Sequence, residues 1–258
     1  MLPLSRALLY IFLSTVSISG SATLGWLYYV HLDHARTQND RYYITAVVQT
    51  GPRPRQLPTG YLAELLDVSV DQPQNLYTYD CKEGVKRLVH SPHITSAKVA
   101  RLAPNALYVD YTARIPAAYL GDFDNVLIDE EGVPFPAAPY FTPKRLPALV
   151  IGIEEVAWGE AIKGRRIRLA LALLCLLQQE GVNPSRIDVS RAYHKSAGRA
   201  EVVLEFDTGP VATVRWRTEA FMEQLSDLKL LIKHLDSSNR FIVDMRVEQL
   251  AFLLKNIK

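Results

Sequence analysis

The side chains of this chain that could do chemistry are two histidines and two acidic clusters, and none has the spacing of a catalytic or metal site. His90 and His93 lie three residues apart, but Pro92 ends any helix that they would share. The acidic clusters at 122–124 and 129–131 lack the wider ligand pattern of a calcium loop and have the composition of turns. The sequence contains no glycine-rich phosphate loop and no Gly-x-Ser-x-Gly elbow. We therefore predict no enzymatic activity, no cofactor and no metal ion.

The two cysteines are expected to be free thiols. Cys175 lies in the apolar run LALLCLLQQ, where a thiol behaves as a small buried hydrophobe. Cys81 lies on the apolar face of a helix predicted much earlier in the chain. Because the two cysteines belong to different predicted domains, we expect no bond between them even in an oxidising compartment.

The composition is that of a folded protein without a nucleic-acid partner. Hydrophobic residues make up 48% of the 258 positions, which is enough for the cores of one or two domains. The formal net charge is +2, and the charged residues are spread along the chain without a basic tract. We therefore expect no nucleic acid to bind.

An uncharged apolar stretch lies near the start of the chain. Residues 7–30 contain no charged side chain, and this length is enough to span a bilayer. Trp26 and two tyrosines lie at its end, as aromatic residues do at membrane interfaces. A cleaved signal peptide is the alternative, because the small residues at 20–22 resemble a cleavage site, but the apolar run continues beyond them. We favour an uncleaved transmembrane helix that lies in the lipid bilayer.

The charges that flank this stretch do not settle its orientation. Arg6 precedes it, and Arg36 and Arg41 follow it closely. Long domains cross the membrane with little regard to such charges. We interpret residues 1–6 as a short cytoplasmic tail and 31–41 as a juxtamembrane linker, and we expect the rest of the chain outside the cytoplasm.

Residues 42–115 are predicted to form a domain with the element order strand, helix, helix, strand, strand. The segment 42–50 is rich in β-branched and aromatic residues and is typical of a strand, and Gly51 begins a turn. Thr59 is expected to cap a short helix that ends at Leu66.

A second helix of this domain begins at the capping box Asp80-x-x-Glu83 and ends before Pro92. The segments 94–102 and 107–113 then form an antiparallel hairpin that packs against it. The residues expected on the apolar face of the helix are Cys81, Val85, Leu88 and Val89, and those on one face of the second strand are Leu107, Val109, Tyr111 and Ala113.

Residues 116–258 are predicted to form a mainly antiparallel β domain with packed helices, so the fold class is α+β. Ile167–Leu177 is apolar nearly all round and ends before Gly181, which indicates a helix buried in the core. Glu219–Leu235 has the spacing of an amphipathic helix. Strands are expected at 118–120, 126–129, 187–190, 201–206, 211–216, 241–247 and 250–254.

The helix and hairpin of the first domain resemble the POTRA domain of the FtsQ/DivIB family of bacterial division proteins. His93 and Ala113 depart from the family pattern, which usually has Trp and Glu there. The run NVLIDEEGVPF is similar to the hairpin that opens the family's β domain. The matching positions are Pro92, Ala97, Val99, Arg101, Pro104, Asn105, Leu107, Arg114, Pro116 and Ala118, with weaker matches at Val47, Gly51, Leu66, Asn75 and Leu76.

The resemblance implies a membrane-anchored scaffold that links early and late proteins of the division machinery at the septum of the inner membrane. In the family, the far end of the β domain holds the small coiled-coil proteins FtsB and FtsL, and the POTRA domain contributes to recruitment. We therefore expect FtsB-like and FtsL-like partners and other membrane proteins of the divisome. An adaptor in envelope biogenesis or secretion is the alternative, because POTRA domains also serve there.

The predicted partner site is the pair of strands at the end of the chain. An exposed edge strand offers unpaired N–H and C=O groups to which a partner can add a strand. The apolar side chains of these strands could equally fill the core, and the sequence does not separate the two roles. The candidate residues are Phe241, Val243, Met245, Val247, Leu250, Phe252 and Leu254.

Overall fold

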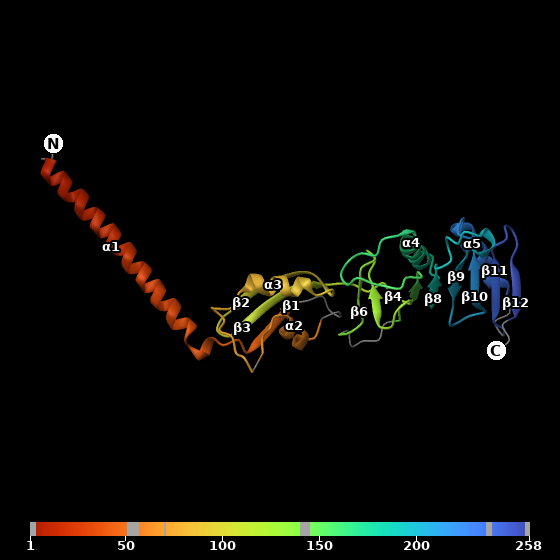
Figure 1. Ribbon diagram of the computed structural model, residues 1–258, viewed down its shortest axis with the longest axis horizontal. Coiled ribbons are helices and arrows are strands. Elements are labelled where there is room, and N and C mark those ends of the chain that lie inside the picture. Colours follow the sequence, from red (N-terminus) through yellow and green to blue (C-terminus); the bar gives the residue numbers. More distant parts are fainter. Residues whose placement is uncertain (1–3, 51–56, 70, 140–144, 236–238, 256–258) are drawn as a thin grey trace. The chain divides into compact units, whose positions relative to one another are not determined.

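The computed structural model describes residues 4–50, 57–69, 71–139, 145–235 and 239–255, which fold as an α+β protein with two compact units (Figure 1). The first unit contains Met1–His90 and Ser96–Thr112, and the second contains Ser91–Thr95 and Ala113–Lys258. The α+β class is as predicted. The predicted turn at Gly51 lies outside the described residues.

Helix α1 (Leu4–Thr37) is long and apolar enough over Leu8–Thr37 to cross a membrane (Figure 1). This agrees with the predicted transmembrane helix. The helix continues past Val30 into the segment expected to be a linker, because that segment contains no proline or glycine to stop it.

Asn75 satisfies the backbone at the end of α1. Its buried side-chain amide donates hydrogen bonds to the carbonyl oxygens of Arg36 and Thr37, at 3.0 Å each. Its Oδ1 accepts from the backbone N–H of Tyr77 at 2.9 Å. The ring of Tyr77 lies 5.3 Å from the Arg36 guanidinium and meets Tyr42 edge-on. The last carbonyl oxygens of a helix have no N–H donor within the helix, and the Asn75 amide supplies such donors at the end of α1.

The elements of the first unit follow the predicted order. In the part of the chain that the structure describes, three strands form a sheet in the order β1-β3-β2, with β1 parallel to β3. The first strand begins later than predicted, because Asp40–Tyr42 form a 3-10 turn that the Asn39 side chain caps. The elements are β1 (Ala46–Thr50), α2 (Thr59–Leu65), α3 (Cys81–His90), β2 (Ile94–Leu102) and β3 (Ala106–Ala113).

The two helices of this unit begin in different ways. Asp80 caps α3 as predicted, because its Oδ1 accepts from the N–H groups of Lys82 and Glu83 at 2.8 and 3.3 Å. The Glu83 half of the capping box differs: its carboxylate pairs with Lys86 Nζ at 3.1 Å. The bonds from Glu83 and Lys82 lower the pKa of the Asp80 carboxyl. The predicted cap at Thr59 is wrong: its hydroxyl instead accepts a bond from Gln49 at 2.8 Å.

The core of the first unit confirms the hairpin face and corrects the helix face. Leu107, Val109 and Tyr111 are buried in this core, and Ala113, which belongs to the second unit, is buried as well, as the alternation predicts. In α3, Leu88 is buried, Cys81 and Val85 are half-buried, and Val89, at 45% exposed, is not part of the core. Gly84 is buried in its place.

Tyr79 packs closely against Gly84. A Cβ atom at position 84 would lie 2.7 Å from the Tyr79 hydroxyl and 3.2 Å from Leu66 Cδ2. The same hydroxyl donates to the Leu66 carbonyl at 3.0 Å, so it cannot move aside without losing that bond. Burial raises the pKa of Tyr79 to about 12. The close contact explains why a glycine stands on the buried face of α3.

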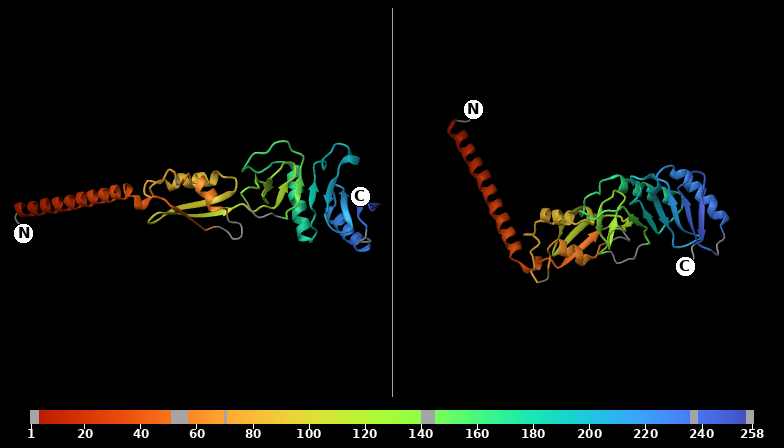
Figure 2. Two further views of the ribbon diagram at one scale, coloured as in Figure 1. Left: turned by 90° about the horizontal axis from the view of Figure 1, so that it is seen from below. Right: turned by 45° about the vertical axis from the view of Figure 1, so that its right-hand side comes forward.

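Among the described residues of the second unit, nine strands form one sheet in the order β12-β11-β10-β9-β8-β7-β4-β5-β6. Figure 2 shows the ribbon from two further sides. Most neighbouring pairs are antiparallel, and the pairs β4–β7, β7–β8 and β10–β11 are parallel. The strands are β4 (Ala118–Leu120), β5 (Val126–Ile128), β6 (Pro134–Pro136), β7 (Ala148–Val150), β8 (Arg186–Asp188), β9 (Val202–Glu205), β10 (Val211–Trp216), β11 (Phe241–Met245) and β12 (Phe252–Lys255).

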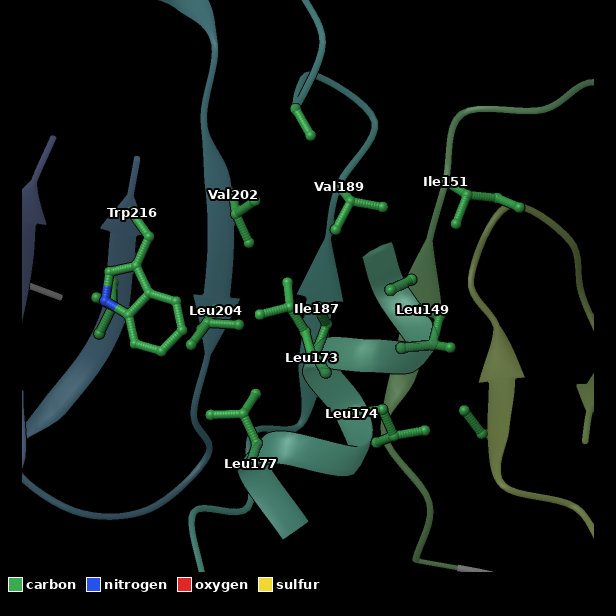
Figure 3. Close-up of a cluster of buried hydrophobic side chains, with 14 of the residues drawn as sticks. Leu149, Ile151, Leu173, Leu174, Leu177, Ile187, Val189, Val202, Leu204 and Trp216 are labelled. Carbon is green, nitrogen blue, oxygen red and sulfur yellow. The ribbon is translucent and has the colours of Figure 1, made fainter. Parts of the chain in front are cut away.

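Helices α4 (Arg165–Gln179) and α5 (Phe221–His234) cover one face of this sheet. Figure 3 shows the leucines of α4 directed at the side chains of β7, β8 and β9. The helix ends as predicted: Gly181 has φ +70°, and the Val182 N–H bonds to the Leu177 carbonyl at 2.8 Å. Only one face of α4 is buried, so Cys175 is exposed and its predicted burial is wrong.

A matched pair of glycines tests the packing of α3. Replacing Gly84 with alanine should lower the free energy of unfolding by about 1–3 kcal/mol, because the added methyl group overlaps Tyr79 and Leu66. The same change at Gly60 in α2, where an added Cβ atom would have nothing within 4 Å, should be neutral or stabilise by up to about 1 kcal/mol. Urea unfolding followed by circular dichroism measures both. Equal effects of the two substitutions would contradict this packing.

Candidate functional site

The nine-stranded sheet has two edges, and their backbones differ in chemistry. At one edge, β6 has the sequence Pro-Phe-Pro, so Pro134 and Pro136 have no N–H to donate. At the other edge, β12 has the sequence Phe-Leu-Leu-Lys, in which every residue has an N–H. Among the described residues, no strand pairs with the outer side of β12. Only the β12 edge therefore keeps the full set of groups that accept a further strand.

The side chains of β12 are apolar and exposed. Phe252, Leu253 and Leu254 are 54%, 43% and 61% exposed. Leu253 pairs with the buried Val243 and so lies on the face of the sheet that α5 covers. Phe252 and Leu254 alternate with it and lie on the opposite face. An added strand would therefore meet apolar side chains on both faces of the sheet.

The structure separates the predicted partner-binding residues into two groups. Strand β11 lies between β10 and β12, so it is not an edge. Val243 and Met245 are 0% and 5% exposed and belong to the core. Phe241 is half-buried against the same core. The exposed residues are those at or beside the β12 edge: Val247, Leu250, Phe252 and Leu254.

A cavity of about 510 Å³ lies between α5 and the connection from β11 to β12. Its lining is mixed: Leu230, Leu231, Met245, Val247 and Leu250 are apolar, and Arg217, Gln224, Asp227, His234 and Gln249 are polar or charged. Leu230, at 57% exposed, opens onto it from α5. The cavity adjoins the strand edge, so a partner strand at β12 and a side chain in the cavity could be held together.

A second cavity of about 540 Å³ is lined by Arg217, Asp244, Arg246 and Phe252. Arg246 forms a two-point contact with Asp244, with Nε–Oδ1 and Nη2–Oδ2 distances of 2.9 and 2.7 Å. This contact lowers the pKa of Asp244 and raises that of Arg246. The buried Glu201 lies 3.4 Å from Arg246, and Arg191 and Arg215 lie 3.5 and 3.9 Å from the same carboxylate.

Two of the positions that match the family pattern, Arg101 and Asn105, form hydrogen bonds that hold neighbouring segments in place. Arg101 donates to the Tyr79 carbonyl at 2.9 Å, and Asn105 donates to the Thr45 hydroxyl at 2.8 Å. Of the others, Leu107 and Pro116 are buried, Pro92, Ala97 and Val99 are half-buried, and Pro104 is exposed at the hairpin turn.

Arg114 joins two segments of the second unit through a buried ion pair. Its Nη1 lies 2.7 Å from Asp129 Oδ2, and its Nε donates to the Pro92 carbonyl at 2.9 Å. Asp129 Oδ1 also accepts from the Val133 N–H at 2.8 Å. A buried ion pair whose other polar atoms are hydrogen-bonded holds the fold together. The match of Arg114 to the family pattern is therefore explained by this structural role, and no bound ligand is needed to explain it.

His93, which departs from the family pattern, is a core residue. It is 3% exposed, and its Nε2 lies 3.0 Å from the Pro136 carbonyl and 2.6 Å from that of Ala138. Burial lowers the pKa of the imidazole. Because both neighbours are acceptors, the proton of the neutral ring belongs on Nε2. His90 is exposed, so the two histidines do not form a site.

The structure brings no metal-binding cluster together in the described part of the chain, where no group of three or more His, Cys, Asp or Glu side chains could hold an ion. The sequence interpretation missed Leu253 and the α5 residues Leu230 and Leu231. Leu253 lay inside the predicted strand 250–254, and its alternation with Phe252 and Leu254 was the available signal. The α5 residues had no such signal, because only the fold brings them beside β12.

Within the described residues, one helix long and apolar enough to span a membrane is followed by folded α+β units, an arrangement that fits a single-pass membrane protein. No family model matches the chain. The chain is 32% identical over 166 residues to the cell division protein FtsQ of Anaeromyxobacter sp. (strain K). This match covers 64% of the chain and 52% of that protein, so the chain spans about half the length of this curated relative. The homology confirms the resemblance to the FtsQ family.

Two substitutions separate the core role from the edge role in the terminal strands. Val243→Asp places a charge in the core without a partner and should lower the free energy of unfolding by about 3 kcal/mol or more. Leu254→Asp, at an exposed position on the neighbouring strand, should change it by less than about 1 kcal/mol. Urea unfolding followed by tryptophan fluorescence measures both, in a chain where Trp26 and Trp158 are replaced with phenylalanine so that Trp216 of the same core is the reporter. Similar losses at the two positions would contradict the assignment of β12 as the open edge.

Proposed function

We propose that this protein is a membrane-anchored scaffold of the bacterial division machinery. The homology to FtsQ supports a role in cell division, and helix α1 fits a single-pass anchor. In this proposal the protein has no enzymatic activity and links early to late division proteins at the septum of the inner membrane. Residues 1–6 lie in the cytoplasm and the folded units lie outside it.

The first unit, in this proposal, is a POTRA domain over 42–115, and residues 116–258 are the FtsQ-like β domain. The order strand, helix, helix, strand, strand supports the first assignment. The Arg114–Asp129 pair and the hairpin 126–136 support the second, because they lie where the family's β domain opens.

The observation that carries the proposal is the difference between the two edges of the nine-stranded sheet. The β6 edge has two prolines, whereas β12 has no proline, has unpaired N–H groups on the alternate residues that point away from β11, and has exposed apolar side chains. We infer that FtsB-like and FtsL-like coiled-coil proteins, or other divisome membrane proteins, add a strand to β12. The added strand would bury Phe252 and Leu254 and use the unpaired backbone groups together.

An adaptor in envelope biogenesis or secretion remains the alternative function. The same open strand edge would serve that role. The FtsQ homology favours division, and the location of the protein in its host separates the two.

The double substitution Phe252→Asp and Leu254→Asp tests the edge. The full chain carrying it should reach the division site but should capture at least about tenfold less of its coiled-coil partners, since two charges replace the apolar contacts of the added strand. Fluorescence imaging of a tagged chain and co-purification from membranes of the host measure the two outcomes.

The control is Val89→Asp with Met222→Asp, which makes the same chemical change at two other exposed apolar positions. This control should leave partner capture unchanged. Full capture by the β12 variant would rule out the strand edge as the partner site. Uniform signal over the envelope for the unaltered chain would favour the envelope-biogenesis alternative.

A further inference from the structure

The start of α4 carries an excess of positive charge that the helix itself does not favour. Lys163, Arg165, Arg166 and Arg168 lie close together, and the first turn contains no acidic residue. The N-terminus of a helix carries partial positive charge, so basic side chains there cost stability. Helix stability therefore does not explain these residues.

Three of these basic residues line one cavity. Lys163, Arg165 and Arg166 surround a space of about 330 Å³, the lower end of the size range of ligand pockets. Arg166 is held in place, because its Nη1 donates to the carbonyl oxygens of Ile151 and Gly152 at 3.3 and 3.2 Å. Lys163 and Arg165 are exposed. We call this space the α4 cavity.

The rest of the α4 cavity is apolar or aromatic. Ile153 and Ile162 line it from the loop between β7 and α4. Tyr193, which is 48% exposed, lines it from the loop after β8. The cavity therefore combines cationic side chains with an apolar and aromatic wall.

The charge of the α4 cavity is not neutralised by the described part of the protein. Lys163, Arg165 and Arg166 form no ion pair among the described residues. The three glutamates of the loop 154–160 are exposed and are not paired with them. The loop that supplies Tyr193 also contains Arg191, which pairs with the buried Glu201 at 3.5 Å, and Lys195. Residues 154–199 contain eight lysines and arginines against five acidic residues.

We propose that the α4 cavity docks an acidic segment of a protein partner. Carboxylates of that segment pair with Lys163 and Arg165, and an apolar side chain packs against Ile162 and Tyr193. The apolar wall favours a segment that carries apolar side chains over a bare phosphate or a lipid headgroup, neither of which has an apolar group to pack against Ile162.

This docking site is separate from the strand edge and goes beyond the proposed function. In the sheet, β8, β9, β10 and β11 lie between β7, whose end forms the cavity, and β12. A partner strand at β12 therefore leaves the α4 cavity accessible. The second unit would hold two partner segments by different physical means, one by backbone pairing and one by charge.

The test uses the full chain in detergent micelles and a fluorescent peptide of alternating glutamate and leucine with a proline at regular intervals. Proline has no N–H and so prevents the peptide from adding to the β12 edge. Fluorescence anisotropy at low salt measures the Kd. We expect Lys163→Glu with Arg165→Glu to weaken binding about tenfold or more, because two attractive charges become repulsive.

The matched control is Lys98→Glu with Lys233→Glu, which changes the net charge equally at exposed positions of β2 and α5. This control and the Phe252→Asp, Leu254→Asp variant should leave the Kd within about twofold of the unaltered chain, and circular dichroism confirms that each is folded. Equal weakening by both charge variants, or no peptide binding by the unaltered chain, would overturn the proposal. So would binding of phosphatidylglycerol vesicles in place of the peptide through Lys163 and Arg165.

Discussion

Every strand in a sheet must satisfy its N–H and C=O groups, and this requirement determines what the second unit can do. Inside the sheet, the neighbouring strands supply the hydrogen-bond partners of these groups. At the β6 edge, Pro134 and Pro136 have no N–H, so fewer groups lack a partner. At the β12 edge the outward N–H and C=O groups face solvent, and the exposed side chains of Phe252 and Leu254 lie beside these groups. An added strand would satisfy the backbone and bury apolar surface in one step, which is the physical basis of the proposed binding at this edge.

Features fixed by nearby residues could be predicted from the sequence. The cap at Asp80, the alternation of Leu107, Val109 and Tyr111, and the helix end at Gly181 each depend on a few consecutive residues. Where a distant segment decides the outcome, the sequence was a poorer guide. Thr59 bonds to Gln49 instead of capping its own helix, because β1 lies beside it.

The candidate site shows the same contrast between features set by nearby residues and features set by tertiary structure. The sequence indicated two terminal strands with apolar residues, but it could not say which one is the edge. Strand β11 runs parallel to β10 after the crossover through α5, and this pairing places Val243 in the core and leaves β12 outside. The α4 cavity depends equally on tertiary structure, because Tyr193 and Lys163 come from separate loops. The fold thus brings three basic side chains to one cavity, although the charges look evenly spread along the sequence.

Amide hydrogen exchange of β12 tests the central claim most directly. The rates for Phe252–Lys255 would be measured in the full chain alone and with an FtsB-like coiled-coil protein of the host. The account predicts that exchange in β12 slows on binding, because the outward N–H groups become hydrogen-bonded to the added strand. Unchanged exchange in β12 when the partner is bound, with new protection only in the first unit, would contradict it.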